Sequence, residues 1–178
     1  MADISFMHFP STKPAPSFIE DTVNCFSDES SSISTIKGNH HNSDGVLEHI
    51  REGLEKIGFE VEKSKKKVDK ILRPITFGID GVPDLKYEVD AYHAKWKVGL
   101  EVEAGRGTLG NAIYRNLIQG MVLTGVDHLI VAVAKEYKYK SNGKQHTSKD
   151  FEKCIKICSA LSSHTRVELP YTITLIGY

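Results

Sequence analysis

The chain has 178 residues, of which 40% are hydrophobic, enough for one soluble domain with a sizeable core. Its 23 basic and 23 acidic residues give a formal net charge of zero, so overall charge points to no particular partner. Binding to a nucleic acid or another anion must therefore depend on a local patch. No apolar run approaches the length of a membrane helix and the N-terminus lacks a signal-peptide core, so we expect no membrane partner.

Residues 1–43 have the composition of a flexible N-terminal arm. Three prolines interrupt any early helix, and five serines between residues 27 and 34 lie among acidic residues. The segment 17–20 resembles a capping box and is followed by an apolar stripe, which predicts one short helix docked on the domain. The three cysteines (Cys25, Cys154, Cys158) form neither a disulfide framework nor a zinc-binding spacing, which is typical of a reducing cytoplasm.

The folded domain is predicted over residues 44–178. Ser43 is a good N-cap for a helix with an apolar face that extends to Ile57, and Gly58 is typical of its C-terminal stop. A short strand is expected at 59–62. The lysine-rich run that follows contains three consecutive lysines, Lys65, Lys66 and Lys67. Such a run either contacts phosphate groups or forms a solvated loop, and the pattern alone does not separate these readings.

Residues 87–103 alternate apolar and polar residues on both sides of a short break, which predicts a pair of strands. Four carboxylates occupy the polar positions: Glu88, Asp90, Glu101 and Glu103. A turn centred on Lys95 and Trp96 places Asp90 opposite Glu101, and Glu88 opposite Glu103. Like charges that face one another on a sheet are destabilising and raise each other's pKa. A fully solvated face tolerates them, whereas a divalent cation with oxygen ligands neutralises them, and the sequence favours the metal site.

Gly105, Gly107 and Gly110 give a G-x-G-x-x-G spacing between a strand and a helix, the arrangement of dinucleotide-binding loops. The preceding strand, however, ends in Glu101 and Glu103, which would place negative charge beside a pyrophosphate. We therefore keep nucleotide binding by Gly105–Gly110 as a minor alternative. The glycines more simply allow a sharp turn from strand to helix.

The rest of the chain predicts a helix at 109–123, a buried strand at 127–134, a helix from 147 or 148 to 161 and a closing strand at 172–177. Arg115 and Gln119 lie four residues apart and share one face of the first of these helices. Asn142 and Gly143 mark a turn. The expected order is thus helix, strand, acidic hairpin, helix, strand, helix, strand, which gives a mixed sheet covered by helices.

This order, with Asp90 ten residues before Glu101-Val102-Glu103, resembles the PD-(D/E)XK nuclease superfamily, which includes most type II restriction endonucleases. The resemblance covers about residues 44–178. It implies an α/β, restriction-endonuclease-like mixed β-sheet flanked by helices, with the core order α-β-β-β-α-β. Glu103 stands where the family usually has lysine, and this replacement resembles the branch of BamHI and BglII.

The resemblance implies that Asp90, Glu101 and the backbone carbonyl of Val102 hold Mg²⁺, with Mn²⁺ as a substitute. Glu103 would orient or deprotonate the attacking water, and Glu88 would assist. Arg115 and Gln119 would bind the scissile phosphate or hold Glu101 in place, although surface polarity explains them equally well. Glu48, on the first predicted helix, is a further candidate for completing such a site.

The sequence thus predicts a Mg²⁺-dependent endonuclease that acts on DNA, and leaves open whether two copies form a homodimer that cuts both strands. Lys65, Lys66 and Lys67 are the candidate DNA contacts. One alternative is a non-catalytic DNA-binding or assembly module with the same fold. The other is the nucleotide-binding protein that uses Gly105–Gly110.

Overall fold

The computed structural model describes residues 2–105, 107, 108 and 110–178. The helices are α1 (Phe18–Asp28), α2 (Ser30–Ile33), α3 (Ser43–Lys56), α4 (Ala112–Val122) and α5 (Asp150–Ser163). The strands are β1 (Ser5–Phe9), β2 (Glu60–Val61), β3 (Ile71–Pro74), β4 (Lys86–Val89), β5 (Ala91–His93), β6 (Val98–Glu103), β7 (His128–Val133), β8 (Tyr137–Ser141), β9 (Lys144–Ser148) and β10 (Thr172–Gly177).

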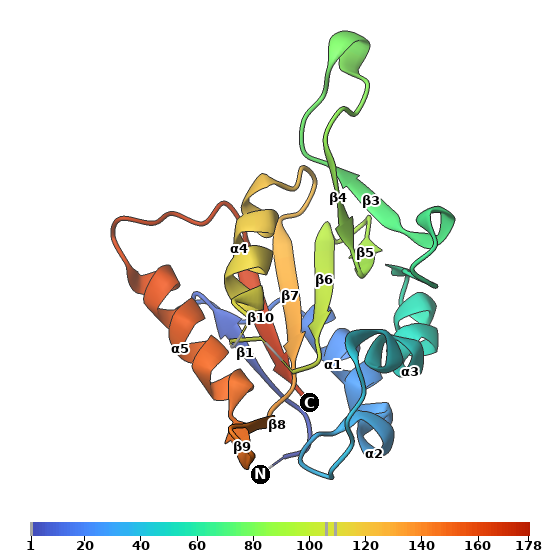
Figure 1. Ribbon diagram of the computed structural model, residues 1–178. Coiled ribbons are helices and arrows are strands. Elements are labelled where there is room, and N and C mark those ends of the chain that lie inside the picture. The colour runs from blue at the N-terminus through green and yellow to red at the C-terminus, as the bar shows by residue number, and fades with distance from the viewer. Residues whose placement is uncertain (1, 106, 109) are drawn as a thin grey trace.

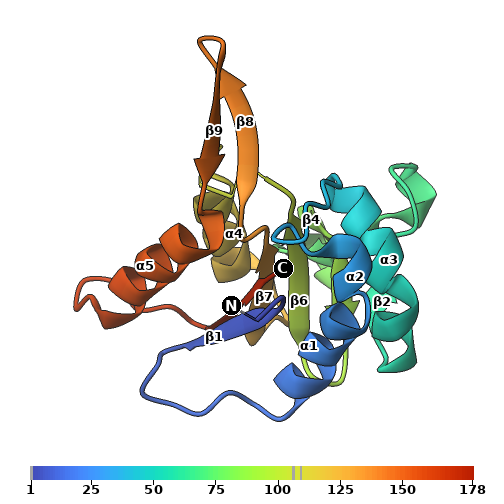
Figure 2. The ribbon, with the colours of Figure 1, turned by 90° about the horizontal axis from the view of Figure 1, so that it is seen from below.

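A six-stranded mixed sheet with the order β1-β10-β7-β6-β5-β2 forms the centre of the molecule (Figure 1). Its middle strands β10, β7 and β6 are parallel, whereas β1, β5 and β2 run antiparallel to their neighbours. Two further pairs, β3–β4 and β8–β9, form separate two-stranded antiparallel sheets. Both pairs project from the body of the molecule (Figures 1 and 2).

Helices cover both faces of the central sheet. The core on one face joins α1 and α3 to side chains such as Leu100, Val102 and Ile176. The core on the other face joins α4 and α5 to the alternate positions of the same strands, among them Val131 and Leu175. All six residues of β7 are buried, because a central parallel strand that is covered on both faces has no polar side.

The N-terminal segment takes part in this core, although its composition suggests a flexible arm over residues 1–43. β1 pairs along its whole length with β10, and α1 buries Ile19 and Phe26 completely. The expected short helix is therefore present, but it belongs to the body of the domain. β1 escapes detection because five residues at an edge of the sheet, bounded by Pro10, show no clear period.

Most expected elements are present with small shifts at their ends. The side chain of Asn42, and not that of Ser43, caps α3 by accepting a hydrogen bond from the Gly45 amide at 2.9 Å. Gly58 follows that helix with a φ of 103°, as a C-terminal stop requires. Helix α4 starts at Ala112, and the expected start at Leu109 lies outside the described residues.

The three cysteines lie in the interior of the protein. Cys25, Cys154 and Cys158 are unpaired and buried, and the last two pack in the core between α5 and the sheet. Burial raises the pKa of the Cys154 thiol to about 12, which makes it unreactive. Among the described residues, no helix combines the length and the apolar character needed to cross a bilayer.

Candidate active site

Three carboxylates lie side by side where β2, β5 and β6 meet. The expected turn produces the expected register, because Ala91 pairs with Leu100 across β5 and β6. Asp90 and Glu101 occupy the next position, and on the other side of β5 the Glu62 amide donates to the Asp90 carbonyl at 2.8 Å. We call Glu62, Asp90 and Glu101 the acidic row. Side-chain alternation places this row on the face of the sheet that also carries α4.

Asp90 is held in a break between two strands. Its Oδ2 accepts a hydrogen bond from the Val102 amide at 2.8 Å, which orients the carboxylate toward β6. Burial raises the pKa of Asp90 to about 6, and the charges of Glu62 and Glu103 push it in the same direction. The hydrogen bond from Val102 opposes this shift but does not cancel it.

Glu101 has the more strongly perturbed carboxylate. Burial raises its pKa well above the ordinary value for glutamate, and the neighbouring Asp90 and Glu103 add to the shift. Its Oε1 accepts a hydrogen bond from the side-chain amide of Gln119 at 3.2 Å. Asp90 and Glu101 thus form a half-buried pair of acids, and neither takes part in an ion pair among the described residues. Such a pair accepts either protons or a metal ion.

Glu103 differs from this pair because two groups on α4 hold it. Its Oε1 accepts a hydrogen bond from Asn116 at 2.9 Å and forms an ion pair with Arg115 at 2.7 Å. Asn116 is 1% exposed, so it is a fixed support, whereas the Arg115 side chain is 67% exposed. Asn116 is absent from the sequence-based candidates, although its place one turn before Gln119 on α4 puts it within reach of the same strand.

Glu88 lies away from the row, so its expected position opposite Glu103 is wrong. The chain leaves the central sheet at Asp90, and β4 pairs instead with β3, with Glu88 opposite Leu72. The Glu88 side chain is half exposed and forms an ion pair with Lys70 at 3.0 Å. Only its backbone carbonyl approaches the site, where it accepts a hydrogen bond from Gln119 at 2.5 Å.

Glu62, which is absent from the sequence-based candidates, is the third carboxylate of the acidic row. It is 4% exposed and is held by two lysines, Lys65 at 3.2 Å and Lys70 at 3.1 Å. The signal was present in the alternation of Phe59–Glu62, which puts residue 62 on one side of the expected strand. The pairing of this strand with β5, which the pattern does not reveal, brings it beside Asp90.

The three lysines of the lysine run differ in their contacts. Lys65 forms ion pairs with Asp44 at 2.7 Å and with Glu62, and the hydrogen bond with Asp44 raises its pKa. Lys66 and Lys67 are exposed, and no ion pair of theirs occurs within the described part of the chain. Lys65 therefore supports the site from behind, whereas Lys66 and Lys67 remain candidate phosphate contacts. Glu48 is exposed and lines a cavity of about 280 Å³ together with Asp44 and Glu62.

The donor atoms of the acidic row suit a hard divalent cation. Carboxylate oxygens are the ligands that Mg²⁺ prefers, and burial together with the neighbouring carboxylates raises the pKa of Asp90 and of Glu101, which a bound cation would oppose. The side chains are not, however, gathered around one point. In the described ranges, no three His, Cys, Asp or Glu side chains converge as a complete metal site would. A cation at this position would therefore draw its remaining ligands from backbone, water or substrate.

The glycine loop is shaped by packing. Gly105 has a φ of 86°, and a Cβ at this position would lie 2.1 Å from the ring of Tyr137. Beyond it, Thr108 donates its hydroxyl to the buried Asp150 at 3.0 Å. A buried carboxylate beside the loop disfavours a pyrophosphate there, and the full Gly105–Gly110 spacing includes Arg106 and Leu109, which lie outside the described residues.

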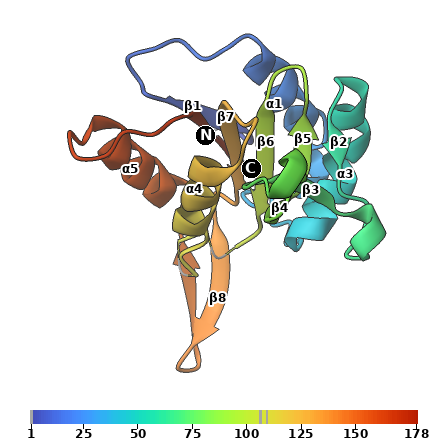
Figure 3. The same ribbon diagram turned by 90° about the horizontal axis from the view of Figure 1, so that it is seen from above.

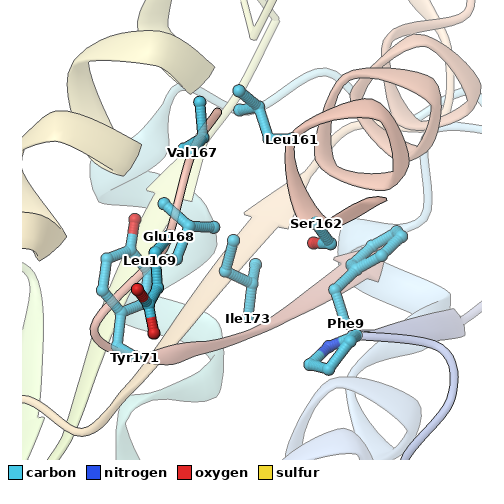
Figure 4. Close-up of a pocket in the computed structure, with 9 residues that line it drawn as sticks. Phe9, Leu161, Ser162, Val167, Glu168, Leu169, Tyr171 and Ile173 are labelled. Atoms are coloured by element: carbon cyan, nitrogen blue, oxygen red, sulfur yellow. The ribbon is translucent and has the colours of Figure 1, made fainter. Parts of the chain in front are cut away.

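A separate cavity of about 190 Å³ lies between the end of α5 and strands β1 and β10 (Figure 4). Phe9, Leu161 and Ile173 contribute apolar walls to it. Among the described residues that line it, Glu168 alone has a carboxylate. One carboxylate without a partner does not provide paired acid and base groups, so this cavity offers no hydrolytic chemistry.

The mixed sheet, its flanking helices and the position of the acidic hairpin define a restriction-endonuclease-like fold, which confirms the predicted fold class. A solved structure with this fold is that of the restriction endonuclease BglII complexed with a DNA 16-mer. The match covers 98% of this chain and 77% of that chain, with a TM-score of 0.52 and 13% sequence identity. At this identity the likeness concerns the fold alone. No protein-family model and no curated protein sequence matches the chain.

Proposed function

We propose that the protein is a Mg²⁺-dependent endonuclease that hydrolyses phosphodiester bonds of DNA at the acidic row. The observation that carries this proposal is the half-buried pair of Asp90, which directly precedes β5, and Glu101 on the adjacent strand β6 of a restriction-endonuclease-like sheet. Both carboxyls have raised pKa values because burial and neighbouring acids disfavour their charged forms. A pair with this excess charge is a candidate functional site and not an ordinary structural contact.

Asp90, Glu101 and the backbone carbonyl of Val102 are the groups that would hold the metal ion. When bound, Mg²⁺ supplies Lewis-acid polarisation of a phosphoryl oxygen and lowers the pKa of a coordinated water. The Val102 amide fixes the Asp90 carboxylate, and Gln119 fixes that of Glu101, so both are oriented before substrate arrives.

Glu103 is the group on this chain that would orient the attacking water or accept its proton. Its contacts with Asn116 and Arg115 keep the carboxylate at the edge of the acidic row. Because Arg115 is largely exposed, its guanidinium is free to turn from Glu103 toward a phosphate of the substrate. Glu103 would then be released for its role only when the substrate is in place.

The test is cleavage of supercoiled plasmid in Mg²⁺ and in EDTA. Wild type should nick the plasmid only in Mg²⁺, and Asp90→Asn or Glu101→Gln should lower the rate by two to three orders of magnitude, roughly the effect of losing a main electrostatic group. Asp84→Asn is the matched control. Pro83–Asp84 matches the Pro-Asp of the motif name in sequence, but Asp84 lies exposed in the loop between β3 and β4 and not in the acidic row. Asp84→Asn should cleave like the wild type.

A non-catalytic DNA-binding module with the same fold is the second candidate. It is favoured by the ion pair between Arg115 and Glu103 and by the lack of three converging metal ligands in the described ranges. Wild type that binds duplex DNA without nicking it in Mg²⁺ or Mn²⁺ would establish this alternative. Equal cleavage by wild type and Asp90→Asn would instead show that the assigned site is wrong.

A further inference from the structure

The β8–β9 pair forms a free-standing ribbon. Figures 2 and 3 show that it extends beyond the body of the protein on the side of the sheet that carries α4. The two strands pair over five positions, from Tyr137 opposite Ser148 to Ser141 opposite Lys144. Asn142 and Gly143 connect them, both with positive φ, as a tight two-residue hairpin turn requires. The ribbon therefore has a defined register as far as its tip.

The ribbon carries only positive charge. Residues 137–149 contain four lysines and no aspartate or glutamate, in a chain whose formal net charge is zero. Lys149 forms an ion pair with Glu152 at the base. Lys138, Lys140 and Lys144 are exposed, and no acidic group of the described residues lies within ion-pair distance of them. Three uncompensated lysines on one projecting element form a concentrated patch for an anionic partner.

The two faces of the ribbon have different roles. One face holds a stack of rings, in which Tyr139 lies 5.9 Å from Tyr137 and 5.4 Å from His146 between ring centroids. These contacts stiffen the ribbon along its length. The opposite face carries four exposed polar side chains that can all donate hydrogen bonds: Lys138, Lys140, Gln145 and Thr147.

Both ends of the ribbon are anchored near the segment that follows β6, the strand that carries Glu101 and Glu103. At one end, Tyr137 packs against Gly105, only two residues after Glu103. At the other end, Ser148 and Thr108 both donate to the buried Asp150, which begins α5. The segment that leaves the candidate active site is thus the same segment that supports the ribbon. Anything held by the ribbon is held at a fixed position relative to Glu103.

We propose that the β8–β9 ribbon enters the major groove of duplex DNA and positions the duplex on the acidic row. A two-stranded β-ribbon fits a major groove, which is about 12 Å wide. Lys138 and Lys140 neutralise phosphates along the groove, and Gln145 and Thr147 face the edges of the bases. This inference names the substrate as double-stranded and rests on the proposed function for the cleavage that follows, but it concerns binding alone.

The test measures binding of a fluorescently labelled 30-base-pair duplex by anisotropy, in EDTA, over a range of salt concentrations. Lys138→Gln/Lys140→Gln should weaken binding about tenfold and reduce the slope of log affinity against log salt by about 1.8, or 0.9 for each lost phosphate contact. The matched control is Lys13→Gln/Lys56→Gln, which removes two lysines outside the ribbon and should leave the slope unchanged.

The groove is tested with a duplex in which glucosylated 5-hydroxymethylcytosines fill the major groove. Wild type should bind this duplex about as weakly as the ribbon variant binds the unmodified one, whereas a minor-groove ligand such as netropsin should not compete. Equal affinity for both duplexes, or equal salt slopes for wild type and the ribbon variant, would overturn the inference. So would a ribbon variant that loses affinity equally for single-stranded RNA and for duplex DNA.

Cleavage assays separate this inference from the proposed function. If wild type cuts plasmid in Mg²⁺ and the ribbon variant binds and cuts equally well, the endonuclease proposal stands and the proposed role of the ribbon is wrong. If wild type binds duplex DNA through the ribbon but does not cut it, the inference about the ribbon is supported and the proposed catalysis is wrong. A wild type that binds no duplex overturns the inference about the ribbon.

Discussion

The acidic row and the β8–β9 ribbon are opposite in charge, burial and support. The row places Glu62, Asp90 and Glu101 side by side in the interior of the sheet, at a cost that appears as raised pKa values for Asp90 and Glu101. The ribbon places its lysines in solvent, where like charges cost little. Both are attached to the segment around Gly105. A formal net charge of zero thus conceals two separated charged regions, and only the buried one stores unfavourable electrostatic energy.

The first consequence of this difference concerns pH. The pKa of Asp90 is raised from 3.8 to about 6, so between these values the folded protein keeps a proton that the unfolded chain has released. The free energy of unfolding therefore falls as the pH rises through this window, by about 3 kcal/mol at 1.36 kcal/mol for each pKa unit. Asp90→Asn removes this loss.

The measurement is urea denaturation in EDTA between pH 4 and pH 7.5. The stability of Asp90→Asn relative to wild type should increase with pH, because asparagine still accepts the hydrogen bond from Val102 and carries no charge. Lys138→Gln/Lys140→Gln is the control from the ribbon, and its curve should run parallel to that of wild type. Parallel curves for all three proteins would show that Asp90 is not electrostatically strained.

The second prediction is that a bound metal ion offsets the repulsion between Asp90 and Glu101. Without metal, Glu101→Gln should stabilise the protein by about 0.5 to 1 kcal/mol, because it removes repulsion across the strand pair. With Mg²⁺ or Mn²⁺ at roughly a hundredfold excess over Kd, wild type should gain about 2.7 kcal/mol and the variant far less. Thermal melts of both proteins, with and without duplex DNA, test this. No metal-dependent rise in Tm in either case would show that the row does not bind a metal ion.

The third prediction concerns the contact between Gly105, which follows β6, and Tyr137 at the base of the ribbon. Gly105→Ala combines an unfavourable positive φ with a collision between the new Cβ and the ring of Tyr137, and should cost about 2 kcal/mol or more. Gly143→Ala at the tip is the matched control, since it has a positive φ but no atom within 4 Å of its added Cβ. It should cost about 1 kcal/mol. Equal losses in urea denaturation would mean that Tyr137 does not pack on Gly105.

The fourth prediction concerns the other basic segment, Lys65–Lys67. Neutralising Lys65, Lys66 and Lys67 together should weaken DNA binding about equally for all sequences, because phosphate contacts carry no base information. The salt slope should fall by about 1.8 and not by about 2.7, since Lys65 is already engaged by Asp44 and Glu62. Lys65→Gln alone should leave the slope unchanged. A fall of about 2.7 in the salt slope would show that Lys65 leaves Asp44 and Glu62 and contacts a DNA phosphate.

The alternation of residues 87–103 was sufficient to predict the register of Asp90 and Glu101, because a two-residue period and one turn determine which side chains face each other. It was not sufficient for Glu88. A strand can leave one sheet for another without changing its period, and β4 does so at Asp90. The pattern within a segment therefore predicts which side chains share a face of the sheet, whereas the strand with which it pairs depends on residues far away in the sequence.

The same limit explains the other omissions. Strand β2 has two residues, so nothing in its sequence announces that Glu62 would lie beside Asp90. The division of the lysine run depends on Asp44, which approaches Lys65 only in the folded chain. The turn at Asn142–Gly143 was predicted correctly, but the sequence does not show that β7, which leads into the ribbon, pairs in parallel with β6 and so brings Val133 opposite Glu103.

If the acidic row binds a divalent metal ion, that ion can be located by crystallography. Crystals of the protein grown with Mn²⁺ and a duplex that carries a non-hydrolysable phosphate linkage would reveal the metal by anomalous scattering. We expect one Mn²⁺ held by carboxylate oxygens of Asp90 and Glu101, and no anomalous peak at this position in crystals of Asp90→Asn. Mn²⁺ bound elsewhere, or an acidic row with no anomalous peak while the duplex is bound, would contradict it.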